Sequence, residues 1–284
     1  MNRHRSIAVL LCAALLSGCN IFDDSAVQEL ATAPILTTAR IKFHNFSPSS
    51  VGVDFFSDGV KMSAVLSGSC SPLLPTTADT IKAKCAAAGI EATTGVGYGT
   101  CTAGVCTAGP AAGGLYSAIT AGAHTLVAKM AAKDTVVATV TQTIDNNKYY
   151  SFFMSGIYNT TSKTAEAFVV EDPIPATIDY TVAHVRLVNA ISNGTTDLNL
   201  FVQSTATGST ETAVGGAVVY KAAGTFVTVP VGTYDIRVRY TGVGTNLIAR
   251  TTLSLLGGRV YTITSRGNTA TATTLGLDFT QNNR

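Results

Sequence analysis

The chain has 284 residues, of which 13% are charged and 46% are hydrophobic, and its formal net charge is +2. This composition excludes disorder over most of the chain, and the balanced charge gives no electrostatic basis for binding nucleic acid. Roughly 265 residues remain beyond a short N-terminal segment, a length that suits two ordinary domains.

The first nineteen residues have the pattern of a secretory signal. Arg3 and Arg5 precede an apolar stretch, Ser6–Leu16, that is too short to span a bilayer as a mature helix. The following Leu16-Ser17-Gly18-Cys19 resembles the bacterial lipobox. The resemblance implies cleavage before Cys19 and lipid attachment to that cysteine. The alternative is an ordinary signal peptide with a chance cysteine.

Lipidation at Cys19 implies a protein held at a membrane of the cell envelope. Cleavage removes Arg3 and Arg5 and no acidic residue, so 17 Lys and Arg would face 17 Asp and Glu in the mature chain. Asn20 favours the outer membrane, by resemblance to the sorting rules of Gram-negative bacteria. The face of that membrane stays open. Residues 19–37 have no clear periodicity, and we expect them to form the lipidated tether.

The rest of the chain is a tandem repeat, because four blocks of the first half recur in the same order in the second half. Two copies are too few for a solenoid and predict two domains. The matched blocks are 39–45 with 183–189, 53–56 with 196–199, 121–127 with 231–237, and 148–152 with 259–263.

Each matched block is predicted to be a β-strand. Tyr234, Ile236, Val238 and Tyr240 alternate with polar residues, which is the period of a strand with one buried face. Its counterpart from His124 to Met130 is Ala-rich, but the clearer copy identifies it as a strand. Short strands with no crossover helices between them predict antiparallel sandwiches. We therefore expect an all-β fold with domains at 38–170 and 181–284; the alternative is one β structure across both.

The residues between the predicted strands are typical of turns. Gly122 and Gly232 precede matched strands, where positive φ is useful. Asp145-Asn146-Asn147 and Leu256-Gly257-Gly258 predict hairpin turns. Residues 171–180 are the predicted linker, stiffened by Pro173 and Pro175. Its first residues, Glu171 and Asp172, are expected to be solvated.

The first domain carries an insertion at about 57–118 that contains all four remaining cysteines. A short helix is predicted at Thr77–Ala88, stopped by Gly89. An even number of cysteines in an oxidising compartment predicts two disulfides. Three pairings are open, and we favour the one in which each bond closes a short loop; a zinc site is the alternative. The insertion is either a binding loop or an idle excursion. The favoured pairs are Cys70–Cys85 and Cys101–Cys106.

These blocks together resemble a bacterial envelope family known as domain of unknown function 4397. The matching segments are Ala39–Pro48, Val53–Phe56, Asp58-Gly59 and Pro230–Tyr234. The resemblance implies immunoglobulin-like sandwiches in exported or surface proteins, and it carries no catalytic residues. The second unit departs from the family pattern, with Ser192-Asn193 in place of Ser-Pro.

Few residues suggest chemistry. The mature histidines are His44, His124 and His184; we expect His124 to take the strand position of Tyr234 and His184 to lie on a solvated face. No Gly-x-Ser-x-Gly elbow is present, and no cofactor or metal is expected. The sequence predicts a non-catalytic envelope lipoprotein with a structural, adhesion or recognition role and a protein or glycan ligand. The alternatives are a periplasm-facing accessory subunit and a hydrolase with an unrecognised site.

Overall fold

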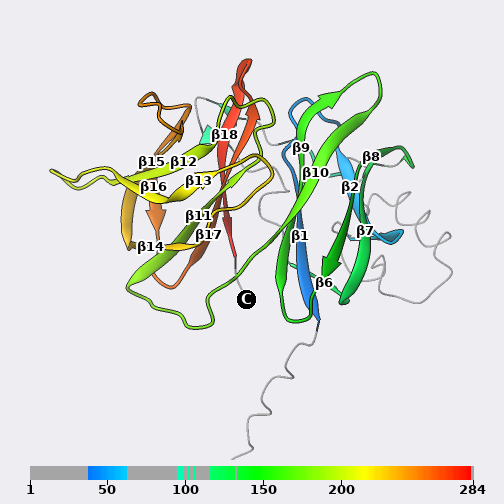
Figure 1. Cartoon of the computed structure of the whole chain (residues 1–284), viewed down its shortest axis with the longest axis horizontal. Helices are drawn as coiled ribbons and strands as arrows, with labels where there is room; N and C mark the ends of the chain where they lie inside the picture. The colour runs from blue at the N-terminus through cyan, green and yellow to red at the C-terminus, as the bar shows by residue number, and fades with distance from the viewer. Residues whose placement is uncertain are drawn as a thin grey trace, which may run out of the picture. The chain divides into compact units, whose positions relative to one another are not determined.

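Each half of the chain folds as two four-stranded sheets packed face to face (Figure 1). The computed structural model describes residues 38–62, 95–98, 101–102, 105–106, 116–131 and 133–282. The strands of the first half are β1 (Ala39–Asn45), β2 (Val53–Ser57), β3 (Val60–Lys61), β4 (Cys101–Thr102), β5 (Val105–Cys106), β6 (Ser117–Ile119), β7 (Gly122–Met130), β8 (Val136–Ile144), β9 (Tyr149–Asn159) and β10 (Thr164–Glu171). Those of the second half are β11 (Val182–Asn189), β12 (Leu198–Ser204), β13 (Thr212–Val218), β14 (Val227–Pro230), β15 (Gly232–Tyr240), β16 (Ile248–Leu255), β17 (Val260–Asn268) and β18 (Thr271–Gln281).

The two halves have the same topology. We call β10-β9-β1-β6 the first inner sheet and β3-β2-β7-β8 the first outer sheet. Their counterparts are the second inner sheet, β18-β17-β11-β14, and the second outer sheet, β13-β12-β15-β16. The register repeats as well, since Arg40 pairs with Tyr149 in the first half and His184 with Val260 in the second. The all-β, sandwich-like fold is thus confirmed.

The expectation of purely antiparallel sheets is wrong for the inner sheets. β1 runs parallel to β9, and β11 runs parallel to β17. A parallel pair needs a crossover connection, which is usually a helix. Here the chain leaves β1 for the outer sheet at β2, adds β6 to the far edge of the inner sheet, passes through β7 and β8 of the outer sheet, and returns to the inner sheet at β9. The facing sheet therefore replaces the crossover helix.

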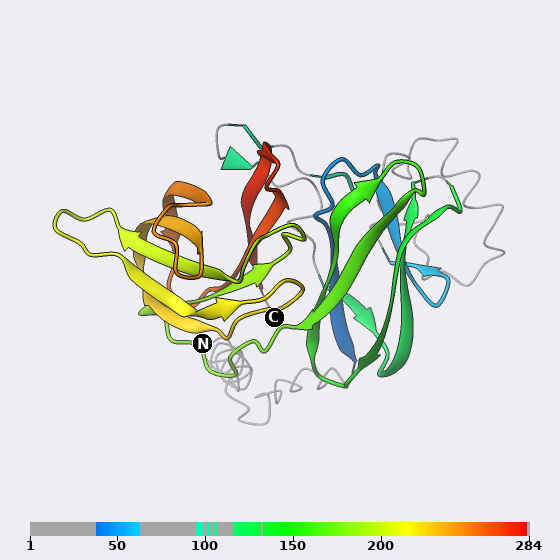
Figure 2. The same ribbon diagram turned by 45° about the horizontal axis from the view of Figure 1, so that its top comes forward.

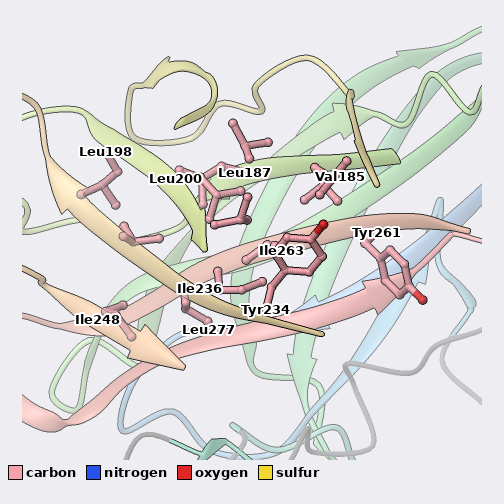
Figure 3. Packing of buried hydrophobic residues seen from close by; sticks show 14 of the residues in the cluster. Val185, Leu187, Leu198, Leu200, Tyr234, Ile236, Ile248, Tyr261, Ile263 and Leu277 are labelled. Atoms are coloured by element: carbon pink, nitrogen blue, oxygen red, sulfur yellow. The ribbon is translucent and has the colours of Figure 1, made fainter. Parts of the chain in front are cut away.

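A hydrophobic core fills the space between the two sheets of each half. In the second half, Val185, Leu187 and Ile263 of the inner sheet face Leu200 and Ile236 of the outer sheet (Figure 3). The alternation predicted for β15 is observed: Tyr234, Ile236 and Val238 are buried and the residues between them are half-buried. In the first half, Phe43, Phe55 and Phe152 pack together in the equivalent space, with ring centroids 5.1 to 5.8 Å apart.

The inner sheets are buried on both faces. Nearly every residue of β9 and β17 is buried, in contrast to the alternation of β15. A second apolar cluster on the far side of the first inner sheet contains Phe46 and Phe153, and it packs against Val188 of the second half. The described residues accordingly belong to one compact unit, Thr38–Arg284. The independence of the two predicted domains remains a prediction.

The predicted equivalence of blocks 53–56 and 196–199 is wrong by two residues. The sequence pairs Asp54 with Asp197, whereas in the structure Asp54 pairs with Lys129 and Asn199 pairs with Arg239. Lys129 and Arg239 are equivalent, so the counterpart of Asp54 is Asn199. The predicted alignment fails because the turn at 190–197 is longer than the turn at 46–52. Matching Asp54 to Asp197, because both are Asp, displaces the block by two residues.

Turn residues occupy the expected positions. Asp58 and Gly59 both have positive φ between β2 and β3, as a tight hairpin requires. Asn147 (φ 60°) and Gly258 (φ 70°) are equivalent and close the two turns that precede β9 and β17. The prediction that these turns are hairpins is wrong, because each one joins an outer-sheet strand, β8 or β16, to an inner-sheet strand with which it does not pair. The predicted helix and Cys70 and Cys85 lie outside the described residues. Among the residues that are described, no helix could span a membrane.

A tyrosine at the same position in each half anchors the preceding turn. The buried phenol oxygen of Tyr150 accepts a hydrogen bond of 3.1 Å from the Asp145 N–H, and that of Tyr261 accepts one of 3.2 Å from the Leu256 N–H. We expect Tyr261→Phe to lower the free energy of unfolding by about 1 kcal/mol, because it leaves a turn N–H without its acceptor. Urea unfolding measures this. Tyr180→Phe, at a side chain that is 77% exposed, is the control and should change nothing; equal effects of the two would contradict the role.

Candidate functional site

The described residues include only some of the predicted cysteine sites. Cys19, Cys70 and Cys85 lie outside the described residues. The backbone places Cys101 directly opposite Cys106 in the antiparallel β4–β5 pair. Residues opposite each other in such a pair have Cα atoms about 4.5–5.5 Å apart, within the range that a disulfide spans. The Cys101–Cys106 bond stays a prediction, and its backbone register is a suitable one.

His124 lies in the position of Tyr234, as predicted, and is buried in an ordered set of contacts. Its Nδ1 is 2.6 Å from the Asp58 carboxylate and 3.2 Å from the Ser57 hydroxyl. Its Nε2 is 2.9 Å from the Thr120 carbonyl. The Tyr234 hydroxyl likewise donates to the Pro230 carbonyl, which is the equivalent of Thr120.

These contacts differ from those of a catalytic triad. A triad needs Ser and Asp on opposite ring nitrogens, with Nε2 free to take the Ser proton. Here Ser57 and Asp58 share Nδ1, and Nε2 faces a carbonyl that can only accept a hydrogen bond. The Thr125 N–H and His124 together hold the pKa of Asp58 below its ordinary value. The arrangement suits a clamp that ties β7 to the β2–β3 turn.

A fully buried ion pair lies between the inner sheets of the two halves. The Arg186 guanidinium pairs with the Asp172 carboxylate, and both side chains are at most 1% exposed. Arg186 also donates to Thr262 Oγ1 at 3.0 Å and to the Glu171 carbonyl at 2.8 Å. Asp172 accepts in addition from Ser151 at 2.6 Å and from Tyr116 at 2.7 Å. Asp172 is therefore not solvated, contrary to expectation, because it begins the connection between two packed halves.

The same contact occurs a second time with the halves exchanged. Lys42 is the equivalent of Arg186, and its ammonium donates to Asn282 Oδ1. Asn282 is the equivalent of Asp172. The Asn282 N–H donates to the carbonyl of the first residue of β17, and the Asp172 N–H donates to the carbonyl of the first residue of β9. Asn282 also donates to Thr262 at 2.9 Å. Reciprocal contacts of this kind define an isologous interface, so the two halves meet as the subunits of a symmetric dimer do.

The outward side of the second outer sheet carries a network of half-buried polar side chains around an aromatic ring. We call it the outer polar face; its residues are Asn199, Phe201, Gln203, Glu211, Arg237 and Arg239. Glu211 accepts from Arg237 at 3.0 Å and from Arg239 at 2.8 Å. Hydrogen bonds from Arg239 and Arg237 lower the pKa of Glu211. The Arg239 guanidinium lies 4.6 Å from the ring centre of Phe201. The β12–β13 loop projects beside this face (Figure 2).

The first outer sheet repeats the central pair of this face. Lys129, the equivalent of Arg239, lies 5.0 Å from the ring centre of Phe56, the equivalent of Phe201. Asp54 pairs with Lys61 at 3.1 Å. The carboxylates of both faces lie in ion pairs, Glu211 with two guanidinium groups and Asp54 with an ammonium group. Such groups suit recognition by hydrogen bonds and stacking.

Sequence inspection could not find these sites. The strand pattern places Arg237 and Arg239 outward, which is a recoverable signal, but Glu211 joins them only through the β12–β13 hairpin. Asp172, Arg186 and Lys42 are far apart in sequence and resemble ordinary surface charges. Among the described residues, no three His, Cys, Asp or Glu side chains gather as a metal site.

Comparisons with known proteins add little. No family model matches the chain, and no curated protein matches it. Among solved structures, one similar chain is a leucine-rich repeat protein from Bacteroides thetaiotaomicron, at 11% identity and a TM-score of 0.18. The match covers 82% of this chain and 26% of that chain, so this chain spans about a quarter of that protein. A TM-score of this size carries no argument about fold or function.

Proposed function

We propose that the mature chain is a non-catalytic, lipid-anchored protein of the bacterial envelope that recognises a protein or glycan at the cell surface. The observation that carries the recognition role is the outer polar face, where Arg237 and Arg239 converge on Glu211 over an aromatic ring. Arginine and aromatic side chains dominate the binding energy of protein interfaces. The lipobox-like segment before Cys19 supports the anchor.

We further propose that each half is an immunoglobulin-like sandwich of the domain of unknown function 4397 family. The support is the paired contact of Tyr150 and Tyr261 with the turn before each strand. It is similar to the tyrosine corner of immunoglobulin-like domains, in which a phenol bonds to backbone a few residues upstream.

The anchor is tested by Cys19→Ala in the full chain. We expect this variant to leave the membrane fraction or to remain unprocessed, because it lacks the acyl chains whose burial holds the protein, at about 0.8 kcal/mol per methylene. Fractionation of cells and mass measurement of the product detect both outcomes. Cys12→Ala, within the predicted signal, is the matched control. An unchanged membrane fraction and mass for Cys19→Ala would disprove lipidation.

The outer polar face is tested by placing a photo-cross-linking amino acid at Gln203 or at Asn199 and irradiating living cells. Both side chains are half-buried at the face and tolerate extension toward solvent. We expect a discrete cross-linked product that disappears when Arg237→Ala and Arg239→Ala are added. The control position is Thr139 on β8, an exposed edge residue outside this face. Equal products from Thr139 and Gln203, or none from the face, would contradict the recognition role.

A second candidate function is an accessory subunit that holds a partner protein within the periplasm. The same outer polar face would serve it. The two functions differ in the side of the membrane on which the halves lie.

A further inference from the structure

A small pocket lies where the linker crosses the turn between β16 and β17. Its volume is about 230 Å³. One wall is the linker, with Ile174, Pro175 and Ile178, and the other is formed by Val260 and the start of β11. At roughly 30 Å³ for a water-sized group, this volume holds roughly eight non-hydrogen atoms. The remaining lining residues are Thr177, His184, Gly258, Arg259 and Asn282.

The linker wall is fixed at both ends. At its start, Asp172 is held by the buried ion pair with Arg186, and its carbonyl accepts from the Ile174 N–H at 2.7 Å. At its end, the Gly258 N–H donates to the Asp179 carbonyl at 3.1 Å and to the Val182 carbonyl at 2.9 Å. The pocket is thus formed before any ligand arrives, as small-molecule sites usually are.

Two glycines make this close approach feasible. A Cβ on Gly257 would lie 1.8 Å from the Tyr180 carbonyl oxygen. A Cβ on Gly258, which has φ +70°, would lie 2.8 Å from the Tyr180 ring and 2.9 Å from Ile178. The Gly-Gly turn therefore lets the linker lie flat on the β16–β17 connection and shape the pocket.

The pocket has apolar walls, and two of its polar lining residues, His184 and Asn282, have buried side-chain atoms; the Asn282 amide is engaged by Lys42 and Thr262. His184 Nε2 is buried, and among the described residues it has no hydrogen-bond partner. Buried polar atoms are nearly always paired, so such an atom beside a cavity indicates a group that it contacts there. The exposed Arg259 lines the same pocket and contributes a positive charge. The carboxylate of Asp179, in the same linker, is engaged by the N–H and hydroxyl of Thr181.

We propose that this pocket binds a small organic carboxylate with a compact apolar body. The carboxylate contacts Arg259 and His184 Nε2, and the apolar body packs on Ile174, Pro175 and Ile178. This site is separate from the outer polar face, so either can fail without the other.

The test uses benzoate, whose nine non-hydrogen atoms are close to the size of the pocket. The purified mature protein is labelled at histidine, and the imidazole Cε1–Hε1 resonances of His44, His124 and His184 are followed by NMR during titration. We expect a saturable shift of the His184 resonance alone. Benzamide, which has the same shape without the charge, should bind at least about tenfold more weakly, as should benzoate with Arg259→Gln, because a charge-assisted contact is lost.

Two variants keep the test decisive. His184→Gln removes the imidazole that contacts the carboxylate. Ile178→Trp fills the pocket, and because the Ile178 side chain is 50% exposed, the substitution leaves the hydrophobic core unchanged. In Ile178→Trp we expect the His184 resonance to persist and no longer respond to benzoate. An unmoved His184 resonance in the wild type up to roughly 10 mM benzoate, tenfold above a weak Kd of ~1 mM, would overturn the site. Equal binding of benzamide, or full binding by Ile178→Trp, would also overturn the proposal.

Discussion

Asp172→Ala is expected to lower the free energy of unfolding by about 3–5 kcal/mol, the largest effect of any single substitution considered for this protein. The variant leaves the Arg186 guanidinium, which is at most 1% exposed, without its carboxylate. An uncompensated buried charge costs about this much in proteins. Ser151 and Tyr116 lose their acceptor in the same step. Urea unfolding of the purified mature chain measures the loss.

The neighbouring residue provides the control. Glu171→Ala removes a carboxylate that pairs with Lys148 at 2.9 Å, with both side chains about 40% exposed. Exposed pairs of this kind contribute about 0–1 kcal/mol. In addition, Asp172→Leu combined with Arg186→Met should recover much of the stability, because an apolar pair can replace a buried ion pair. Similar losses for Asp172→Ala and Glu171→Ala would show that the interface between the halves is not buried as described.

The stability of the protein is expected to rise between pH 8 and about pH 9.5, through Lys42. Burial lowers the pKa of Lys42 from 10.5 to about 8, with Asp172 raising it and Arg186 lowering it by smaller amounts. The unfolded chain thus binds the proton more tightly than the folded chain does, so above pH 8 unfolding takes up a proton and its free energy increases with pH. The gain is about 1–2 kcal/mol over this range.

The reciprocal interface offers a variant that tests this dependence of stability on pH. Asn282→Asp gives Lys42 the carboxylate that Arg186 already has in Asp172. A nearby carboxylate raises the pKa of Lys42, so the increase in stability between pH 8 and 9.5 should disappear. Lys42→Met should remove it as well. Unfolding free energies at several pH values test this below the range in which tyrosines ionise. A flat or falling wild-type profile, or one unchanged by Asn282→Asp, would contradict the account.

Much of the fold could be predicted from the sequence because strand periodicity and turn residues are local signals. The block containing Tyr234 and Ile236 identified its Ala-rich counterpart as a strand, and the paired turns ending at Asn147 and Gly258 were located from composition. The parallel pairing of β1 with β9 could not be predicted, because it depends on which sheet the chain crosses to and not on any local pattern.

The charged residues show the same limit. Asp172 follows an exposed Glu and precedes a proline, a context typical of a solvated linker, and only the packing of the two halves buries it. Lys42 and Arg186 alternate with core residues, a pattern that is typical of a strand face in contact with solvent. Each of these strand faces would contact solvent if its half were alone, but the other half covers it in the whole chain. His184 likewise became part of a pocket because the linker folds back over the β16–β17 turn.

The side of the membrane on which the halves lie tests the proposed function most directly. A recognition site for a specific protease is inserted at Gly208, in the exposed β12–β13 loop beside the outer polar face. The protease is then added to intact and to permeabilised cells. We predict cleavage on intact cells, which would place the outer polar face where it can meet a surface ligand. Cleavage only after permeabilisation would contradict surface recognition and support the periplasmic accessory role.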